Sequence, residues 1–546
     1  MLLRMRLFAC LVIFACGHTS PTSAEVLPSS SNWDACIAAP TRSCVLREAL
    51  VTASASATPS SYQLGGIAEA YVRAGDIDTA FGIIPLIHRD GLARASVLRS
   101  VASAEAKNGR IDKARDIFAQ ALLLADTIEA PLARVEARLS IAKDEEAAGF
   151  MAEANFLFMM TRELAEALEI RPAPDRGCTM PSQEDRLAVV LGGLARHDAK
   201  VGDLKQALEL ARRIQYSPSM RAAALQAIAE IMAGAGRSDD ARDILNEARD
   251  SAGPTALWLE QHPSCPSMHF RPPDASYYVH SLCQVAKVQA KLGLIDAATA
   301  TLDVVSRLIA DIVDGPVLKA HVAVVGALTE IAEADSEVGL AARAREDLDR
   351  AITAAADVSA TDTAGLFTVT GLARALVRSG RSGDAQHLLE SMLIMVRSSA
   401  VILDRANGLL HLVETRDDVG LSSDRNLLLE TQAAVRAIPS GASISLVRLA
   451  QAWLRAGEMP YAVANFDEAL APMEAMNDRK WIWNLLQQMV RGIPIPDFPA
   501  GRRDPRLTAA AAPHIMKIIQ ASINLDEPAL SGRTEVLLSL AGALPN

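Results

Sequence analysis

The sequence has few aromatic residues and no long apolar run beyond its first residues. Phe, Trp and Tyr make up 4% of the 546 residues, which speaks against direct stacking on sugars. After residue 24, no stretch holds 18 uninterrupted apolar residues, so we expect no membrane span there. With 50% hydrophobic and 22% charged residues, the chain is also not a disordered or low-complexity protein.

The common catalytic and metal-binding motifs are missing. The chain has no Gly-x-Ser-x-Gly, no His-Glu-x-x-His, no Walker loop and no Cys-x-x-Cys. His262, Cys265 and His269 could approach a metal from one loop, but no fourth ligand is evident and a disulfide role for Cys265 is favoured. The adjacent Glu145 and Glu146 are expected on a solvated face. We therefore expect no enzyme, cofactor or metal site.

The first 24 residues have the features of a secretory signal. Arg4 and Arg6 precede an apolar stretch from Leu7 to Ala15, and Thr22-Ser23-Ala24 ends in the small-x-small pattern of a cleavage site. Cleavage would make the net charge of −11 more negative by 2, which is unsuited to binding nucleic acid. We expect a periplasmic or secreted protein, with lipidation at Cys16 as the alternative.

A glycine recurs through the chain in a constant local pattern. Each of nine glycines is preceded by Ala at seven residues and by an aliphatic residue at eight, and is followed by Ala at five. These glycines are Gly75, Gly109, Gly149, Gly202, Gly236, Gly293, Gly339, Gly380 and Gly457. The pattern predicts a helical hairpin, in which Gly ends helix A and the two alanines mark the close crossing with helix B. Asp76 and Asp112 are expected to cap helix B.

These hairpins cannot bury their apolar faces alone, so they are expected to stack into a solenoid. The small residues around each Gly, with a further Ala at twelve after it in four units, resemble the tetratricopeptide repeat. Two of the intervals, Gly75 to Gly109 and Gly202 to Gly236, equal the 34-residue period of that family. The resemblance implies an all-α fold, a right-handed α-solenoid of about ten hairpins. A degenerate unit surrounds Gly420, where Arg425 replaces Ala.

The repeats divide the chain into five parts. We predict a signal peptide at 1–24, an N-terminal helical cap at 25–60, the repeat array at 61–475 and a C-terminal helical cap at 476–546. Two long glycine intervals place Pro-rich insertions in the array near 171–184 and 253–275. Both insertions follow a helix B and are expected on the same edge of the solenoid.

Five cysteines remain after residue 24, in a compartment that favours disulfides. Cys36 and Cys44 flank a short turn between two predicted helices and are expected to be bonded. Cys178 and Cys265 lie in the two insertions, and we favour this pair. The alternative joins Cys265 to Cys283, and at least one thiol stays free or pairs outside the chain.

In tetratricopeptide arrays, the residues six, three and two before the Gly line the concave face. The cations at these positions are Arg73, Lys107, Lys143, Arg196, Lys200, Lys287, Lys291, Arg374, Arg378 and Arg455. The acids there are Glu69, Glu146, Glu230, Glu333 and Glu337. The excess of cations indicates an anionic segment of a protein partner. The alternative is that these cations only complement the helix dipole near its C-terminal end.

The predicted function is a non-enzymatic protein-protein interaction scaffold in the periplasm, binding a partner through the concave face and the inserted loops. One alternative is an envelope assembly factor for polysaccharide export or cell-wall synthesis. The other is an enzyme with a cryptic site in the C-terminal 70 residues. The oligomeric state is left open.

Overall fold

The computed structural model describes residues 32–55, 60–87, 90–168, 183–215, 217–252, 275–314, 321–356, 358, 363–421, 424–439, 442–475, most of 512–520, and 527–544. The described regular elements are all helical. The predicted signal peptide, almost all of both insertions, Cys178 and Cys265 lie outside these residues. No described helix combines the length and the apolar character needed to cross a bilayer.

The described part of the array contains ten consecutive helical hairpins. Their first helices are α4 (Ser61–Ala74), α6 (Gly91–Lys107), α8 (Pro131–Ala147), α10 (Gln183–Val201), α12 (Pro218–Gly234), α15 (Ala275–Lys291), α17 (His321–Val338), α19 (Thr363–Arg378), α21 (Ile402–Asp418) and α23 (Ser443–Arg455). Their second helices are α5 (Ile77–Ile83), α7 (Ile111–Asp126), α9 (Met151–Glu166), α11 (Leu204–Arg212), α13 (Ser238–Ala252), α16 (Ile295–Asp314), α18 (Ala341–Ala355), α20 (Ser382–Ser398), α22 (Arg425–Arg436) and α24 (Met459–Ala475). The predicted all-α solenoid is confirmed.

The glycine between the two helices of each hairpin has the conformation that the pattern requires. All nine predicted glycines and Gly420 have φ between 75° and 93°, a region that favours glycine. At Gly75 the backbone N–H donates to Val72 O at 3.0 Å, and the N–H of Asp76 donates to Tyr71 O at 3.0 Å. These two bonds close the last turn of α4 and direct the chain into α5.

The paired alanines lie where the two helices of a hairpin cross. In the nine hairpins that carry both, each is at most 4% exposed, as Ala102 and Ala114 illustrate. A larger side chain at these positions would push the helices apart, because protein interiors are close-packed. In the tenth hairpin Arg425 takes the second position, and its guanidinium lies outside the crossing, 5.6 Å from the ring centroid of Tyr461.

Only some of the predicted helix caps form. The Asp76 carboxylate accepts from the N–H of Thr79 at 3.1 Å and caps α5. The prediction for Asp112 is wrong: α7 has Arg110 at its N-cap without a side-chain bond, and Asp112 is the second residue of the helix, where it pairs with Arg115. Asp112 instead acts as an acid in the first turn, where it complements the helix dipole.

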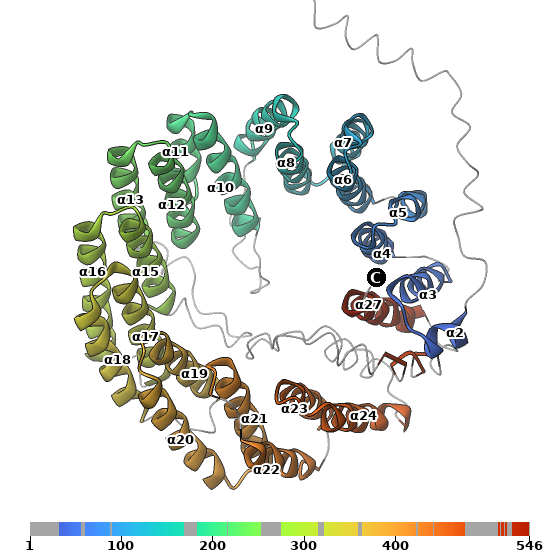
Figure 1. The fold of residues 1–546 in the computed structure, drawn as a ribbon. Helices are drawn as coiled ribbons and strands as arrows, with labels where there is room; N and C mark the ends of the chain where they lie inside the picture. Colours follow the sequence, from blue (N-terminus) through green and yellow to red (C-terminus); the bar gives the residue numbers. More distant parts are fainter. Residues whose placement is uncertain are drawn as a thin grey trace, which may run out of the picture.

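The hairpins stack side by side and the array curves into an incomplete ring (Figure 1). The first helices of the hairpins lie on the inner side of this ring, and the second helices lie on the outer side (Figure 1). We call the first helices the inner row and the second helices the outer row. The concave face predicted from the sequence is therefore the face of the inner row.

The C-terminal helix lies at the N-terminal end of the array. Helix α27 (Glu527–Ala543) packs against α3 (Arg42–Ser54) and α4, and the C-terminus lies beside them in Figure 1. Leu538 of α27 lies beside Gly66 of α4, with its Cδ1 atom 3.4 Å from the position that a Cβ there would take. Helices α27 and α3 thus form a helical pair assembled from the two ends of the chain.

The predicted disulfide between Cys36 and Cys44 is present, with a Cα separation of 5.8 Å. It joins α2 (Trp33–Ala38) to α3 across the turn at residues 39–41. Cys283 is a free thiol on α15 with no exposed surface, which opposes its alternative pairing with Cys265. The favoured pair, Cys178 with Cys265, stays a prediction because both residues lie outside the described parts.

Candidate functional site

Six of the ten predicted groove cations form ion pairs with acids on a neighbouring inner-row helix. Four of these pairs have measured N to O separations: Lys200 to Glu146 at 3.3 Å, Lys287 to Glu337 at 2.9 Å, Lys291 to Glu230 at 3.5 Å and Arg455 to Asp417 at 3.0 Å. Arg374 pairs with Asp418, and Arg378 pairs with Glu333. Each pair joins two neighbouring repeats, so the six cations already have carboxylate partners within the inner row.

The outer row shows the same arrangement. Arg212 on α11 pairs with Glu247 on α13 at 2.7 Å, and Arg397 on α20 pairs with Glu430 on α22 at 2.6 Å. An ion pair between neighbouring repeats is therefore a general device of this array, not a mark of the concave face. The pairs are partly exposed, so each contributes modestly to stability.

The sequence tally of charges omitted the hairpin around Gly420, and this omission hid the partners of two of the six paired cations. The residues six, three and two before Gly420 are all acidic. In the structure, Glu414 accepts from Arg448 at 2.7 Å, Asp417 pairs with Arg455, and Asp418 pairs with Arg374. The positional pattern would have revealed these acids had the degenerate unit been included.

The other four predicted groove cations form no ion pair within the described residues. They are Arg73 on α4, Lys107 on α6, Lys143 on α8 and Arg196 on α10, and all four are exposed. They are also the first four in sequence order and come from four consecutive inner-row helices. The net positive charge of the predicted groove is therefore concentrated in the N-terminal part of the array.

Lys143 on α8 and Arg196 on α10 are neighbours within this group of four cations. The Lys143 ammonium lies beside Gly193 on α10, 3.1 Å from the position that a Cβ there would take. Partial burial and the nearby charge of Arg196 lower the pKa of Lys143 below its ordinary value, although the charges of Asp144 and Glu146 oppose this shift. The lysine and the arginine thus repel each other, and an anion placed between them would relieve that repulsion.

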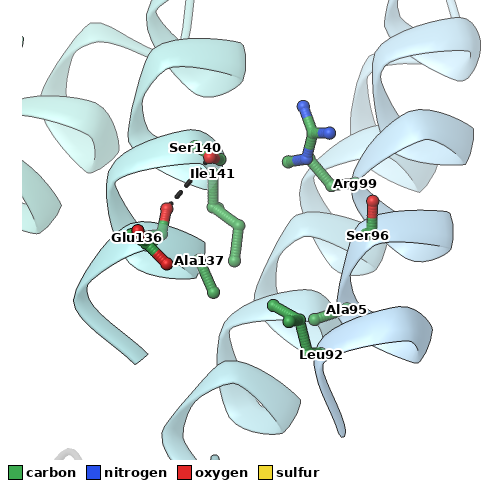
Figure 2. A pocket seen from close by; sticks show the side chains of 8 residues that line it. All are labelled: Leu92, Ala95, Ser96, Arg99, Glu136, Ala137, Ser140 and Ile141. Carbon is green, nitrogen blue, oxygen red and sulfur yellow. Dashed lines mark hydrogen bonds between the residues drawn. The ribbon is translucent and has the colours of Figure 1, made fainter. Parts of the chain in front are cut away.

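A small cavity of about 110 Å³ lies between α6 and α8 (Figure 2). Its apolar lining is Leu92 and Ala95 from α6 and Ala137 and Ile141 from α8. In Figure 2, the side chains of Ala137 and Ile141 point from α8 toward α6, and the side chain of Leu92 points from α6 toward α8. Leu92 is 45% exposed, so the cavity has an apolar wall that water still reaches.

The polar residues around the cavity are held by the neighbouring helices. Ser96 donates to Glu69 on α4 at 2.8 Å, and Arg99 donates to Asp144 on α8 at 2.6 Å. Glu136 accepts from Arg186 on α10 at 2.8 Å. Contacts that reach from α4 to α10 therefore fix the rim, and a ligand entering the cavity would find it already formed.

Burial shifts the pKa of titratable side chains in the described part of the array, including those of His411 and Glu145. His411 Nε2 lies 2.6 Å from Thr370 Oγ1, and burial lowers the pKa of His411 to about 4, so the ring is neutral. The expectation that Glu145 is solvated is wrong. This residue is 7% exposed, and burial with the nearby charge of Glu153 raises its pKa to about 7. Among the described residues, no His, Cys, Asp and Glu side chains form a metal-binding group.

Comparisons with known proteins add little to this picture. No family model and no curated protein matches the chain. Among solved structures, Ton1535 from Thermococcus onnurineus NA1 has a TM-score of 0.26 at 16% identity over 70% of this chain and 97% of that one. Yeast Tom70 has a TM-score of 0.22 at 12% identity over 86% and 98%. The pentatricopeptide repeat protein PPR10 from maize has a TM-score of 0.25 at 16% identity over 88% and 67%. TM-scores this low support no inference about function, so the hairpins of this chain themselves define it as an α-solenoid repeat protein.

Proposed function

We propose that this protein is a non-enzymatic scaffold of the periplasm that binds another protein through its inner-row face, with the two insertions as additional contacts. The observation that carries the proposal is the combination found on α4, α6, α8 and α10. There, unpaired cations stand on the same face as a preformed cavity with an apolar lining. Protein partners use such features, namely an anchor cavity with charged surroundings.

The described part of the C-terminal segment supports a scaffold over a cryptic enzyme, whereas residues 476–511 lie outside the described residues. Val536, Leu537, Leu540 and Ala541 of α27 are at most 1% exposed, and the helix packs on α3 and α4. The segment thus contributes a structural helix to the opposite end of the array. The periplasmic location rests on the sequence of residues 1–24 alone.

Site-specific photo-crosslinking of the full chain in its native compartment tests this function. A photoreactive residue in place of Ser103, on the inner row, is expected to capture one discrete protein. The matched control replaces Gln120, an exposed residue on the outer-row helix α7, and is expected to capture none. Equal capture from both rows, or none from either, would contradict the proposal. Fractionation with and without residues 1–24 tests the location.

A further inference from the structure

The two halves of the predicted groove differ in what a partner must displace. From Lys200 onward, every predicted groove cation already has a carboxylate partner on a neighbouring helix. An incoming acid there would have to compete with that carboxylate. Arg73, Lys107, Lys143 and Arg196 lose only bound water when an acid arrives, so the free energy of binding favours them.

We infer that the partner docks on α4, α6, α8 and α10 through an extended segment that places one aliphatic side chain in the cavity between α6 and α8 and acidic side chains on the unpaired cations. The inner-row face from α12 to α23 serves as a spacer that its own ion pairs hold together. The inference rests on the proposed function and names the chemistry of the partner.

The cavity selects the anchor residue. Leu92, Ala95, Ala137 and Ile141 offer methyl and methylene surface, and the volume of about 110 Å³ suits one aliphatic side chain better than an indole. A preformed cavity binds with little reorganisation, because its rim residues are already immobilised by their hydrogen bonds. A leucine, valine or methionine in the segment would bury its apolar surface there.

The cations stand near the cavity on the same helix faces. Ser140 lines the cavity and Lys143 follows three residues later, about one turn along α8. Arg99 lines it from α6, and Lys107 follows about two turns later. A turn rises about 5.4 Å and an extended residue spans about 3.3 Å. The acids of the partner are therefore expected about two to four residues from its aliphatic anchor.

Charge complementarity determines the kind of segment. Lys143 lies beside Gly193 and is repelled by the charge of Arg196, so a carboxylate between the two cations would accept charge-assisted hydrogen bonds and relieve this repulsion. A basic or neutral segment would leave that repulsion in place. The acid must come from outside, since Glu146 already pairs with Lys200 and Asp144 with Arg99.

The test uses fluorescein-labelled synthetic peptides and the full chain without residues 1–24. The probe peptide has one leucine flanked by aspartates two to four residues away. Its matched peptides replace the leucine by alanine, or the aspartates by lysines or by serines. We expect the leucine–aspartate peptide to bind in a salt-dependent manner, and each replacement to weaken binding about tenfold or more.

Matched protein variants locate the site. Neutralising Lys143→Gln with Arg196→Gln should weaken binding of the probe peptide about tenfold, whereas Lys291→Gln with Arg378→Gln should leave it unchanged. Ala137→Leu fills the cavity and should abolish the preference for leucine over alanine. If this variant does not fold, Leu92→Ser at the exposed wall replaces it, with the helical circular dichroism spectrum as the check.

Several results would overturn the inference. These are no binding of the probe peptide, stronger binding of the lysine peptide, equal loss in both pairs of variants, or a concentration-dependent self-association that the Lys143 and Arg196 changes remove. Capture of a partner by crosslinking together with any of these results would leave the scaffold function standing and reject the docking site alone.

Discussion

Arg42 donates from Nη2 to the carbonyl oxygen of Leu544 at 2.7 Å, across a separation of 502 residues. Its Nε donates to the carbonyl oxygen of Ala541 at 3.1 Å. Both acceptors belong to the C-terminal end of α27, where helix carbonyls lack partners and the helix dipole favours a positive charge. Asp34 on α2 accepts a further bond from Gln520 at 3.2 Å. Helices α2 and α3 thus bind residues from the C-terminal part of the chain.

Arg42→Ala should weaken the attachment of α27. The variant loses two hydrogen bonds from a charged donor and is expected to lose about 1 to 3 kcal/mol of unfolding free energy. Urea denaturation measures this loss, and hydrogen exchange should show faster exchange in α27 and α3. Arg242→Ala, at an exposed pair within one helix, is the control and should change stability by less than about 0.5 kcal/mol. Equal effects of the two changes would contradict the latching role of Arg42.

The five cysteines after residue 24 should fall into three classes. Non-reducing peptide mapping is expected to find Cys36 bonded to Cys44 and Cys178 bonded to Cys265, with Cys283 free. Cys283 should resist alkylation in the native state, because burial excludes the reagent and raises the pKa of its thiol. It should react fully once the protein is unfolded. Finding all five thiols free would reject both bridges and the oxidising compartment.

Ala114→Leu should destabilise the second hairpin. Ala114 has no exposed surface where α6 and α7 cross, so the larger side chain must separate the helices or adopt a strained rotamer. The expected loss is about 1 to 3 kcal/mol of unfolding free energy. Ala119→Leu on the exposed face of α7 is the matched control. Thermal unfolding that is identical in both variants would argue against the assigned crossing.

Glu145→Gln should stabilise the protein in a pH-dependent manner. The pKa of Glu145 rises from 4.5 to about 7 on folding, so the folded state holds a proton that the unfolded state releases between these values. The destabilisation from Glu145 is therefore absent below about pH 4.5, grows as the pH rises, and is complete above pH 7. At pH 8 the variant should gain about 1 to 3 kcal/mol, and at pH 4 it should equal the parent.

Urea denaturation at both pH values measures the effect of Glu145→Gln. The neighbouring Glu146→Gln serves as control, since it removes the partner of Lys200 and should give no gain at either pH. A gain of the same size at pH 4 and pH 8 would show that the charge of Glu145 is not the cause.

The hairpins were predictable because the interactions that form them are local. A glycine with positive φ, an alanine seven residues before it and another five residues after it lie within one hairpin, so their spacing in the sequence is their spacing in the structure. The bond between Cys36 and Cys44 is equally local. The degenerate hairpin at Gly420 keeps the glycine with positive φ, although Val413 and Arg425 take the positions of the two alanines.

The charges and the ends of the chain were decided by the tertiary structure. Whether a cation such as Lys291 is paired depends on which residue of a neighbouring repeat stands opposite it, and the unequal intervals between repeats change that register. The burial of Glu145 likewise depends on how α8 and α9 pack. Helix α27 carries no repeat pattern, and its place on α3 follows from buried apolar side chains and from terminal carbonyls that accept from Arg42, a residue about 500 positions away in the sequence. The sequence by itself therefore determined the repeating unit, whereas contacts between distant residues decided which cations remain available to a partner.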